Sequence, residues 1–164
     1  MKKIELVNGG HALVDDADWE LVSQHQWRCH EPVKGYPYAF YGEHRRTVFL
    51  HRLIMGAAAG QQVDHINGNG LDCRRANLRI CDAAQNQWNS KLRSDNRSGF
   101  KGVHAQSPDG KWTVTIKVRG RLIYLGHYDN VDDAARAYDR AARAYHGEFA
   151  LCNQDLHSST RHRR

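Results

Sequence analysis

The sequence predicts an α+β protein built from two small modules. Short apolar runs broken by Asn-Gly turns fill the first part, which indicates short strands and hairpins. A stretch without an apolar side chain, residues 93–99, then precedes a part in which alternating strands lead into one amphipathic helix. The length of 164 residues allows one ordinary domain or two small ones, and the 40% hydrophobic share is typical of a folded protein.

Composition excludes several classes of protein. The net charge of +6 and the isoelectric point near 9.3 permit a nucleic-acid partner but do not require one. The longest apolar run, residues 53–59, is far shorter than the roughly 18 residues of a membrane span, and the N-terminus lacks the apolar core of a signal peptide. We therefore expect a cytoplasmic protein with no membrane partner. The 4 cysteines contain no C-x-x-C pair, which predicts free thiols and not a zinc site.

The charge is unevenly distributed. Residues 1–93 carry 12 Lys and Arg against 10 Asp and Glu, whereas residues 94–164 carry 12 against 8. With the polar stretch between them, this indicates four segments: a first domain at 1–93 with its core motif at 63–92, a linker at 94–98, a second domain at 99–155, and a basic tail at 156–164.

The first sixty residues predict small elements and no chemistry. Two apolar runs around Asn8-Gly9-Gly10 predict a hairpin, and the acids before Trp19 predict the first turn of a short helix. The aromatic residues at 36–41 indicate strands, and residues 48–55 indicate a strand that runs into a short helix. We interpret these aromatic side chains as core packing.

Residues 63–92 have a different character. The turns at Asn67-Gly68 and Asn69-Gly70 separate two extended pieces, and residues 83–92 are free of Gly and Pro and therefore suit a helix. The predicted local order is strand, loop, strand and helix, with Asp64 and His65 on the first strand and Asn86 early in the helix.

These residue types suit phosphodiester hydrolysis. A hard divalent cation takes oxygen ligands, which the Asp64 carboxylate and the Asn86 amide supply, and a neutral His65 can accept a proton from water. Adjacent strand residues point to opposite faces, so Asp64 and His65 would need a twist or bulge to converge. From spacing alone, turn capping is an open alternative.

Residues 64–68, 75–79 and 85–86 together resemble the HNH nuclease motif in the version found in phage and intron homing endonucleases. The separations of 12 residues from His65 to Asn77 and 9 from Asn77 to Asn86 match that motif. The resemblance implies a ββα-metal fold with His65 as general base, Asp64 and Asn86 as ligands of Mg²⁺ or Mn²⁺, and Asn77 holding the loop and orienting His65. Residues 51–55 also resemble the family, in a packing role. A degenerate, inactive copy is the alternative.

The second part predicts a sheet and a helix. In residues 112–119, Val114, Ile116 and Val118 share one face, and the other face carries Thr113, Thr115, Lys117 and Arg119. Gly120 turns the chain into a second strand at 121–125, and an Ala-rich helical stripe runs from 131 to 145. Lys117, Arg119 and Arg121 are thereby offered to solvent or to phosphate.

Residues 98–153 resemble the ethylene-response-factor (Apetala-type) DNA-binding domain, chiefly through residues 98–103, 124–126, 134–139 and 146–153. That resemblance implies a three-stranded antiparallel sheet, backed by one helix, that lies in the DNA major groove. The positions of the contact residues correspond to Lys101, His104, Trp112, Lys117 and Tyr124. His104 replaces a usual Arg and Tyr124 a usual Trp, so contact with the DNA backbone carries over better than base specificity.

The sequence thus predicts a metal-dependent HNH endonuclease, encoded by a phage or mobile element, that hydrolyses phosphodiester bonds in double-stranded DNA. One alternative is a non-catalytic, sequence-preferring DNA-binding or regulatory protein in which the HNH part is only a scaffold. A second is an RNA-binding module. One HNH site cuts one strand, so a double-strand break would need a dimer or sequential action, and a monomer is compatible with the sequence. The final residues Arg161–Arg164 would add phosphate contact or fray.

Overall fold

The computed structural model describes residues 1–32, 35–43, 46–93, 95–106 and 109–158. The chain divides into two compact units, Met1–Asn86 and Gln87–Arg164, and each is described by itself. The boundaries expected from the sequence, 1–93 and 99–155, stay a prediction. The phosphate contact expected of Arg161–Arg164 lies outside the described residues. Within these residues, no helix is long and apolar enough to cross a membrane.

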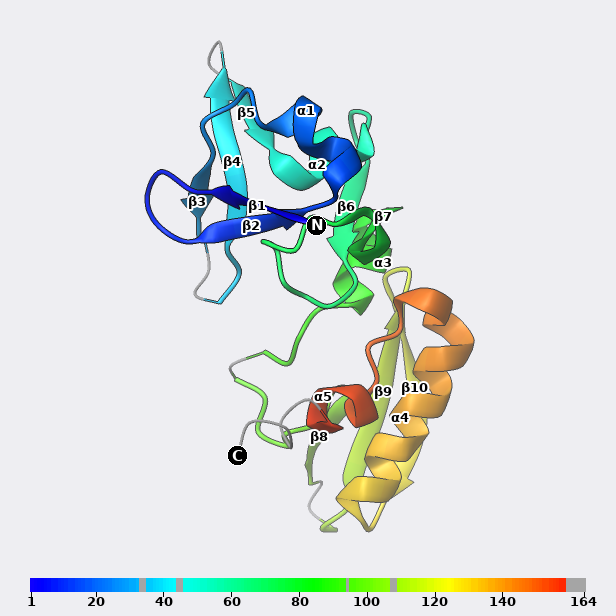
Figure 1. The fold of residues 1–164 in the computed structure, drawn as a ribbon. Helices are drawn as coiled ribbons and strands as arrows, with labels where there is room; N and C mark the ends of the chain where they lie inside the picture. The colour runs from blue at the N-terminus through cyan, green and yellow to red at the C-terminus, as the bar shows by residue number, and fades with distance from the viewer. Residues whose placement is uncertain (33–34, 44–45, 94, 107–108, 159–164) are drawn as a thin grey trace. The chain divides into compact units, whose positions relative to one another are not determined.

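The first unit contains small antiparallel sheets and short helices (Figure 1). A hairpin of β1 (Lys2–Glu5) and β2 (His11–Val14) precedes η1 (Asp16–Asp18) and α1 (Trp19–Val22). A three-stranded sheet follows in the order β3 (Arg28–His30), β4 (Tyr38–Glu43) and β5 (Arg46–Phe49). The remaining elements are α2 (Leu50–Met55), β6 (Gln62–His65), η2 (Arg75–Asn77), β7 (Leu78–Cys81) and α3 (Ala83–Trp88).

A single apolar cluster holds the first unit together. Trp27, Leu50, Val14 and Val22 are essentially inaccessible to solvent, and the indole Nε1 of Trp27 donates to the carbonyl of Val22 at 2.8 Å. Burial of such side chains is the main favourable contribution to folding, about 1.5–3 kcal/mol for each. Because Leu50 belongs to this cluster, α2 is fixed against the core at the point where it follows β5.

The N-terminal hairpin is tied to the segment between β6 and β7. The amide of Leu13 donates to the carbonyl of Leu71 at 2.8 Å, and the amide of Cys73 donates back to the carbonyl of Leu13 at 2.9 Å. The buried carboxylate of Asp18 pairs with the guanidinium of Arg75, with a shortest distance of 2.7 Å. The carboxylate of Asp15 accepts the backbone amide of Arg75 at 2.8 Å. Residues about 60 positions apart therefore fix the start of η2.

The second unit is a three-stranded antiparallel sheet with one long helix against it. The strands are β8 (Val103–Gln106), β9 (Trp112–Val118) and β10 (Arg121–Tyr128), in the order β10-β9-β8. Helix α4 (Val131–His146) packs on the sheet and is followed by η3 (Gly147–Phe149) and α5 (Asn153–Ser158). The predicted α+β class, with a three-stranded sheet backed by one helix, is confirmed.

Small residues allow α4 to approach the sheet closely. Ala134 and Ala142 are fully buried with Val114 beneath them, and the side chain of Asn130 caps the helix by accepting the amide of Asp132 at 2.7 Å. Gly102 has a φ of +71°, and a Cβ built on it would lie 2.0 Å from the ring of Tyr138. Only glycine fits at this position, where the chain enters β8.

Buried polar groups join α4 to α5. The carboxylate of Asp139 accepts the backbone amides of Asn153 at 2.7 Å and Gln154 at 3.0 Å. The side-chain oxygen of Asn153 in turn accepts the amide of Lys101 at 2.6 Å. Both Asp139 and Asn153 are almost fully buried, so these hydrogen bonds are shielded from water.

Two elements differ from the sequence prediction in their bounds. The helix expected at 83–92 ends at Trp88, whose ring stacks on His146 at a centroid distance of 4.4 Å. That tertiary contact is not encoded in local helix propensity, which favoured a longer helix. The strand expected at 121–125 continues to Tyr128, beyond a register shift between Tyr124 and Gly126.

Candidate functional site

Asp64 and His65 are neighbours on a regular strand. The pairing of β6 with β7 runs without a register shift, placing Asp64 opposite Arg79 and His65 opposite Leu78. No bulge therefore redirects either side chain within this pairing, and both residues are only 5% exposed. The carboxylate Oδ2 of Asp64 accepts from Arg79 Nε at 2.9 Å and Nη2 at 2.6 Å, so the buried negative charge has a direct counter-ion.

His65 lies among aromatic side chains and a thiol. Its ring centroid is 4.9 Å from that of His51 on α2 and 5.9 Å from that of Tyr38 on β4, and its Nε2 lies 3.9 Å from the Sγ of Cys73. Burial lowers the pKa of His65 to about 4, against the opposing effect of Asp64 and Asp72. The imidazole is therefore neutral at pH 7 and has a lone pair that can accept a proton.

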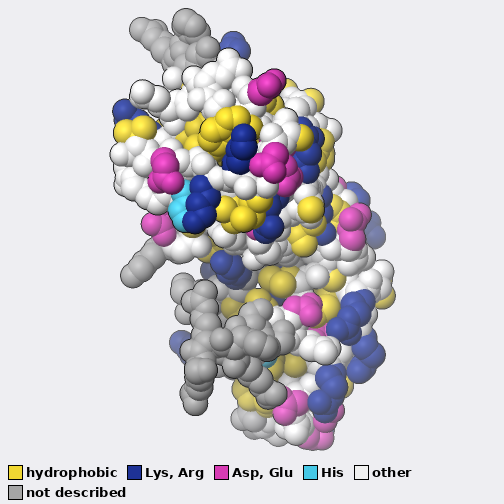
Figure 2. Space-filling view, in the orientation of Figure 1, with side chains coloured by type: hydrophobic (Ala, Val, Ile, Leu, Met, Phe, Trp, Pro, Cys, Tyr) yellow, Lys and Arg dark blue, Asp and Glu magenta, His cyan; other side chains and the backbone are white. Residues whose placement is uncertain are grey.

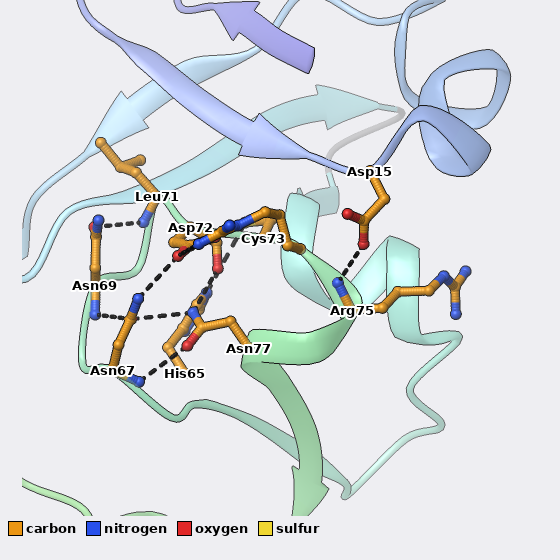
Figure 3. A network of polar contacts seen from close by, with 10 residues as sticks. Asp15, His65, Asn67, Asn69, Leu71, Asp72, Cys73, Arg75 and Asn77 are labelled. Atoms are coloured by element: carbon orange, nitrogen blue, oxygen red, sulfur yellow. Dashed lines mark hydrogen bonds and ion pairs between the residues drawn. The ribbon is translucent and has the colours of Figure 1, made fainter. Parts of the chain in front are cut away.

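Asn77 fastens the loop that follows His65 (Figure 3). Its side-chain oxygen accepts the amide of Asn67 at 3.0 Å, and its side-chain nitrogen donates to Asn67 Oδ1 at 3.0 Å and to the carbonyl of Asp72 at 2.8 Å. Its own carbonyl accepts the amide of Ile66 at 2.9 Å. The side chain thus holds both ends of the loop at once, immediately after His65.

Asp72 and Gly70 also stabilise this loop, Asp72 through hydrogen bonds and Gly70 through close packing. The carboxylate of Asp72 accepts from Asn67 at 2.8 Å and from Arg74 at 2.6 and 2.7 Å, and the hydrogen bonds from Arg74 lower the pKa of Asp72. At Gly70, a Cβ would lie 2.2 Å from the carbonyl oxygen of Pro37 and 2.8 Å from the ring of Tyr38. The second Asn-Gly turn is therefore required for close packing against the start of β4.

Asn86 lines a pocket in the first unit. Its side-chain nitrogen donates to Gln62 Oε1 at 2.7 Å, and Gln62 lies two positions before Asp64 on β6, so these two side chains share a strand face. The pocket has a volume of about 290 Å³. It is lined by His30, Pro32, Tyr38, Phe49, His51, Arg52, Gln62, Val63 and Asn86.

His51 is the residue whose surroundings the sequence did not indicate. The family resemblance predicted a packing role for it; the residue is 8% exposed and its Nδ1 has no hydrogen-bond partner in the described part of the chain. Burial, together with the neighbouring charges of His65 and Arg52, lowers the pKa of His51 to about 3. The signal available in the sequence was a histidine within an otherwise apolar run.

The donor set fits a hard divalent cation whose coordination is completed by substrate. Among the described residues, no group of three or more His, Cys, Asp or Glu side chains could hold a metal ion. Magnesium, however, is commonly bound by one or two carboxylates together with water and phosphate oxygens. The carboxylate of Asp64 and the amide oxygen of Asn86, the two expected ligands, are donors of that kind.

The second unit presents a polar face on its sheet. By register, His104 on β8, Lys117 on β9 and Tyr124 on β10 lie on the face opposite α4. The Nε2 of His104 lies 2.7 Å from the hydroxyl of Thr115 on this face. Tyr124 and Leu122 are 57% and 70% exposed, which is unusual for large apolar side chains. The structure therefore brings three of the expected DNA-contact residues together.

The other four expected contact residues lie elsewhere. Arg119 is at the β9–β10 turn with a φ of 45°, and Arg121 pairs with Val118 and so lies on the opposite phase from Lys117. The ammonium of Lys101 donates to the carbonyl of Trp88, and burial lowers its pKa to about 8. Trp112 packs against the apolar cluster under α4.

Positive charge is also present on the helix side of the second unit. Figure 2 shows Lys and Arg side chains gathered over α4, whose exposed face carries Arg136, Arg140 and Arg143. Arg136 forms an ion pair with Asp133 at 2.6 Å. Arginine side chains are therefore not confined to the sheet, although the three Asp residues of α4 balance their charge.

Comparison with known proteins agrees with this geometry. A profile described as HNH endonuclease matches residues 48–88, which contain α2, β6, β7 and α3. Protein 3.8 of Escherichia phage T7 is 32% identical over 112 residues, which are 68% of this chain and 92% of that protein. An uncharacterized HNH endonuclease, L560, of Acanthamoeba polyphaga mimivirus is 27% identical over 149 residues, which are 89% of this chain and 76% of the relative. The chain belongs to the HNH endonuclease family.

The C-terminal part has a second similarity. The ethylene-responsive transcription factor ERN3 of Medicago truncatula is 41% identical over 71 residues, which are 42% of this chain and 29% of that protein. The likeness to AP2/ERF proteins is thus distant and confined to a segment of the plant protein. It agrees with the three-stranded sheet and helix of the second unit.

Proposed function

We propose that this protein is a metal-dependent endonuclease that hydrolyses phosphodiester bonds in double-stranded DNA. The observation that carries the proposal is a neutral, buried His65 next to Asp64 on a strand that the family profile covers. The loop after His65 is held by Asn77. An imidazole fixed in this way is suited to accept a proton from a water molecule.

In the proposed mechanism, His65 is the general base. A ring nitrogen of the neutral imidazole would take the proton from the attacking water, and Nε2 lies 3.9 Å from the Sγ of Cys73. Asn77 maintains the loop and with it the position of His65. Asp64 and Asn86 would hold Mg²⁺ or Mn²⁺ through their oxygens. Such a cation, when bound, stabilises charge on the phosphate and on the departing 3′ oxygen.

The second unit is proposed to hold the duplex. His104, Lys117 and Tyr124 on the sheet face, with Arg119 and Arg121 near the β9–β10 turn, would contact the DNA backbone. Lys101 and Trp112 support this sheet from positions away from the face. The phage and mimivirus relatives support the further proposal that the protein is encoded by a phage or mobile element and acts in the cytoplasm of a host cell.

A plasmid assay tests the proposal. Wild-type protein should nick supercoiled DNA in the presence of Mg²⁺, and EDTA should abolish the reaction. His65→Ala should lower the rate at least about 100-fold, since general-base catalysis contributes that much or more, and should leave gel-shift binding intact. His11→Ala, which changes an exposed histidine of the same unit, is the matched control. Equal nicking by wild type and His65→Ala would remove the catalytic assignment.

One observation favours the alternative of a non-catalytic DNA-binding protein. The carboxylate of Asp64 is already paired with Arg79, whose side chain is 13% exposed, so a cation would have to compete with a buried counter-ion. Under this alternative, DNA binding is salt-sensitive and no metal-dependent cleavage occurs. The plasmid assay with and without EDTA separates the two functions.

A further inference from the structure

His51 has a buried nitrogen that the fold does not use. The residue is the second of α2 and is 8% exposed, and its Nδ1 has no partner among the described residues. Leaving a buried polar atom unpaired costs roughly 1–3 kcal/mol. A phenylalanine of similar shape would fill the same space without that cost. Packing alone therefore does not account for a histidine here.

The position of His51 connects the two parts of the proposed nuclease site. Its ring lies 4.9 Å from the ring of His65, the proposed base, at an interplanar angle of 73°. His51 also lines the pocket of about 290 Å³. Asn86, a proposed cation ligand, lines the same pocket. A group that enters this pocket therefore meets a wall formed in part by His51 and Asn86.

Arg52, the charged side chain in the pocket lining, is already engaged. Its guanidinium donates to the backbone carbonyls of Gln61, Ala57 and Ala58, which fix the end of α2. His51 is uncharged at neutral pH, so it can approach a phosphate as a hydrogen-bond donor without a strong desolvation cost. The pocket therefore offers a neutral donor beside the proposed cation site.

We propose that His51 is a substrate-binding residue, whose imidazole N–H donates to a non-bridging phosphate oxygen of the DNA backbone at or beside the scissile bond. The inference rests on the proposed nuclease function and adds to it a phosphate contact from α2. A phosphate contact from the pocket-lining imidazole would account for a histidine, and not a phenylalanine, at this buried position. Neutral imidazole and the amide of glutamine are both donors, whereas phenylalanine is not.

The test compares three variants. His51→Phe keeps a ring and removes the nitrogens, His51→Gln keeps a donor, and His25→Phe makes the same change at a half-buried histidine that stacks on Tyr41 in the same unit. Thermal unfolding reports folding. Cleavage against DNA concentration with Mg²⁺ gives kcat and KM, and fluorescence anisotropy of a short duplex with Ca²⁺ gives affinity independently of cleavage.

We expect His51→Phe to unfold at the wild-type temperature or above it, and to raise both KM and the Kd in Ca²⁺ by roughly 10–100-fold. His51→Gln should recover at least part of this loss, and His25→Phe should match the wild type. His51→Met is a second apolar variant for the case in which phenylalanine does not fit.

Two results would overturn the inference. If a folded apolar variant binds and cleaves DNA as the wild type does, His51 is a packing residue. If kcat falls while the Kd stays unchanged and glutamine does not restore activity, His51 acts by positioning His65 and does not bind substrate. If the wild type does not cleave any DNA, the proposed function fails, and the Ca²⁺ anisotropy still decides whether His51 contacts DNA.

Discussion

The two units differ in the partners of their buried acidic side chains. In the first unit, His51 keeps an unpaired nitrogen, and Asp64 has its charge balanced by one arginine at the base of the proposed site. In the second unit, Asp139 and Asn153 are satisfied by backbone groups that join α4, α5 and the chain before β8. In this unit, the residues proposed to contact DNA are the exposed polar residues of the sheet face. One histidine in each unit, His51 or His146, has a buried Nδ1 without a partner among the described residues, so the units differ mainly in what their buried acids contact.

Among the tests of this difference, Asp139→Ala is expected to cause the largest change, a loss of stability in the second unit. The substitution leaves the amides of Asn153 and Gln154 buried without an acceptor, which we expect to destabilise the second unit by about 2–4 kcal/mol. Urea unfolding followed by hydrogen exchange, with peptides resolved for each unit, measures the loss. Asp133→Ala, at an exposed ion pair on the same helix, is the control. Equal destabilisation of the two variants would show that Asp139 is not a structural link.

A smaller effect is expected from pH, and it should fall mainly on the first unit. The folded pKa values of His65 and His51, about 4 and about 3, lie below the ordinary 6.5. The unfolded chain therefore binds protons first as the pH falls. The stability that comes from keeping the two histidines neutral is present above pH 6.5 and is lost as the pH falls toward about 4.

From pH 7 to pH 5.5 the loss in the first unit should be about 2–3 kcal/mol. The second unit has one histidine of this kind, His146, whose pKa burial also lowers, and so should lose less. The same exchange measurement at several pH values gives both slopes, and His51→Phe should reduce the slope of the first unit. A first unit that is more stable at pH 5 than at pH 7 would contradict the expectation.

The smallest effect is expected on the sheet face. Lys117→Ala should weaken duplex binding by about 3–10-fold and reduce the slope of log affinity against log salt by about 1, because one phosphate contact is lost. Gel shifts between 50 and 200 mM salt, roughly the range over which such contacts weaken, provide the measurement. Arg140→Ala removes a cation from the helix side and is the matched control. If the two variants weaken binding equally, positive charge and not the sheet face holds the DNA.

Local patterns in the sequence were sufficient for much of the fold. The order of strand, loop, strand and helix over 63–92 appears as β6, β7 and α3, because turns and periodicity are short-range properties. The alternation of β9 is confirmed as well, with Val114 and Ile116 buried against α4. Asn77 and Asn67 are only 10 residues apart, so the loop closure follows from a local motif.

The rest depends on contacts between distant segments. The burial of His51 arises because α2 packs beside β6, and no spacing within 50–55 encodes that contact. The placement of Lys101 is decided by the carbonyl of Trp88, 13 residues away. Helix α5 has few apolar residues, and its start is fixed by Asp139. Tertiary context of this kind overrides local preference.

The anchoring of Arg75 by Asp15 and Asp18 has a consequence for protein engineering. The family profile covers residues 48–88, which suggests a compact cassette for grafting onto another DNA-binding domain. A graft of that segment alone would lose both aspartates and the hydrogen bonds of Leu13 with Leu71 and Cys73. We therefore expect a transferable HNH module to need residues 1–88, which keep the N-terminal hairpin, both aspartates and the whole of α3.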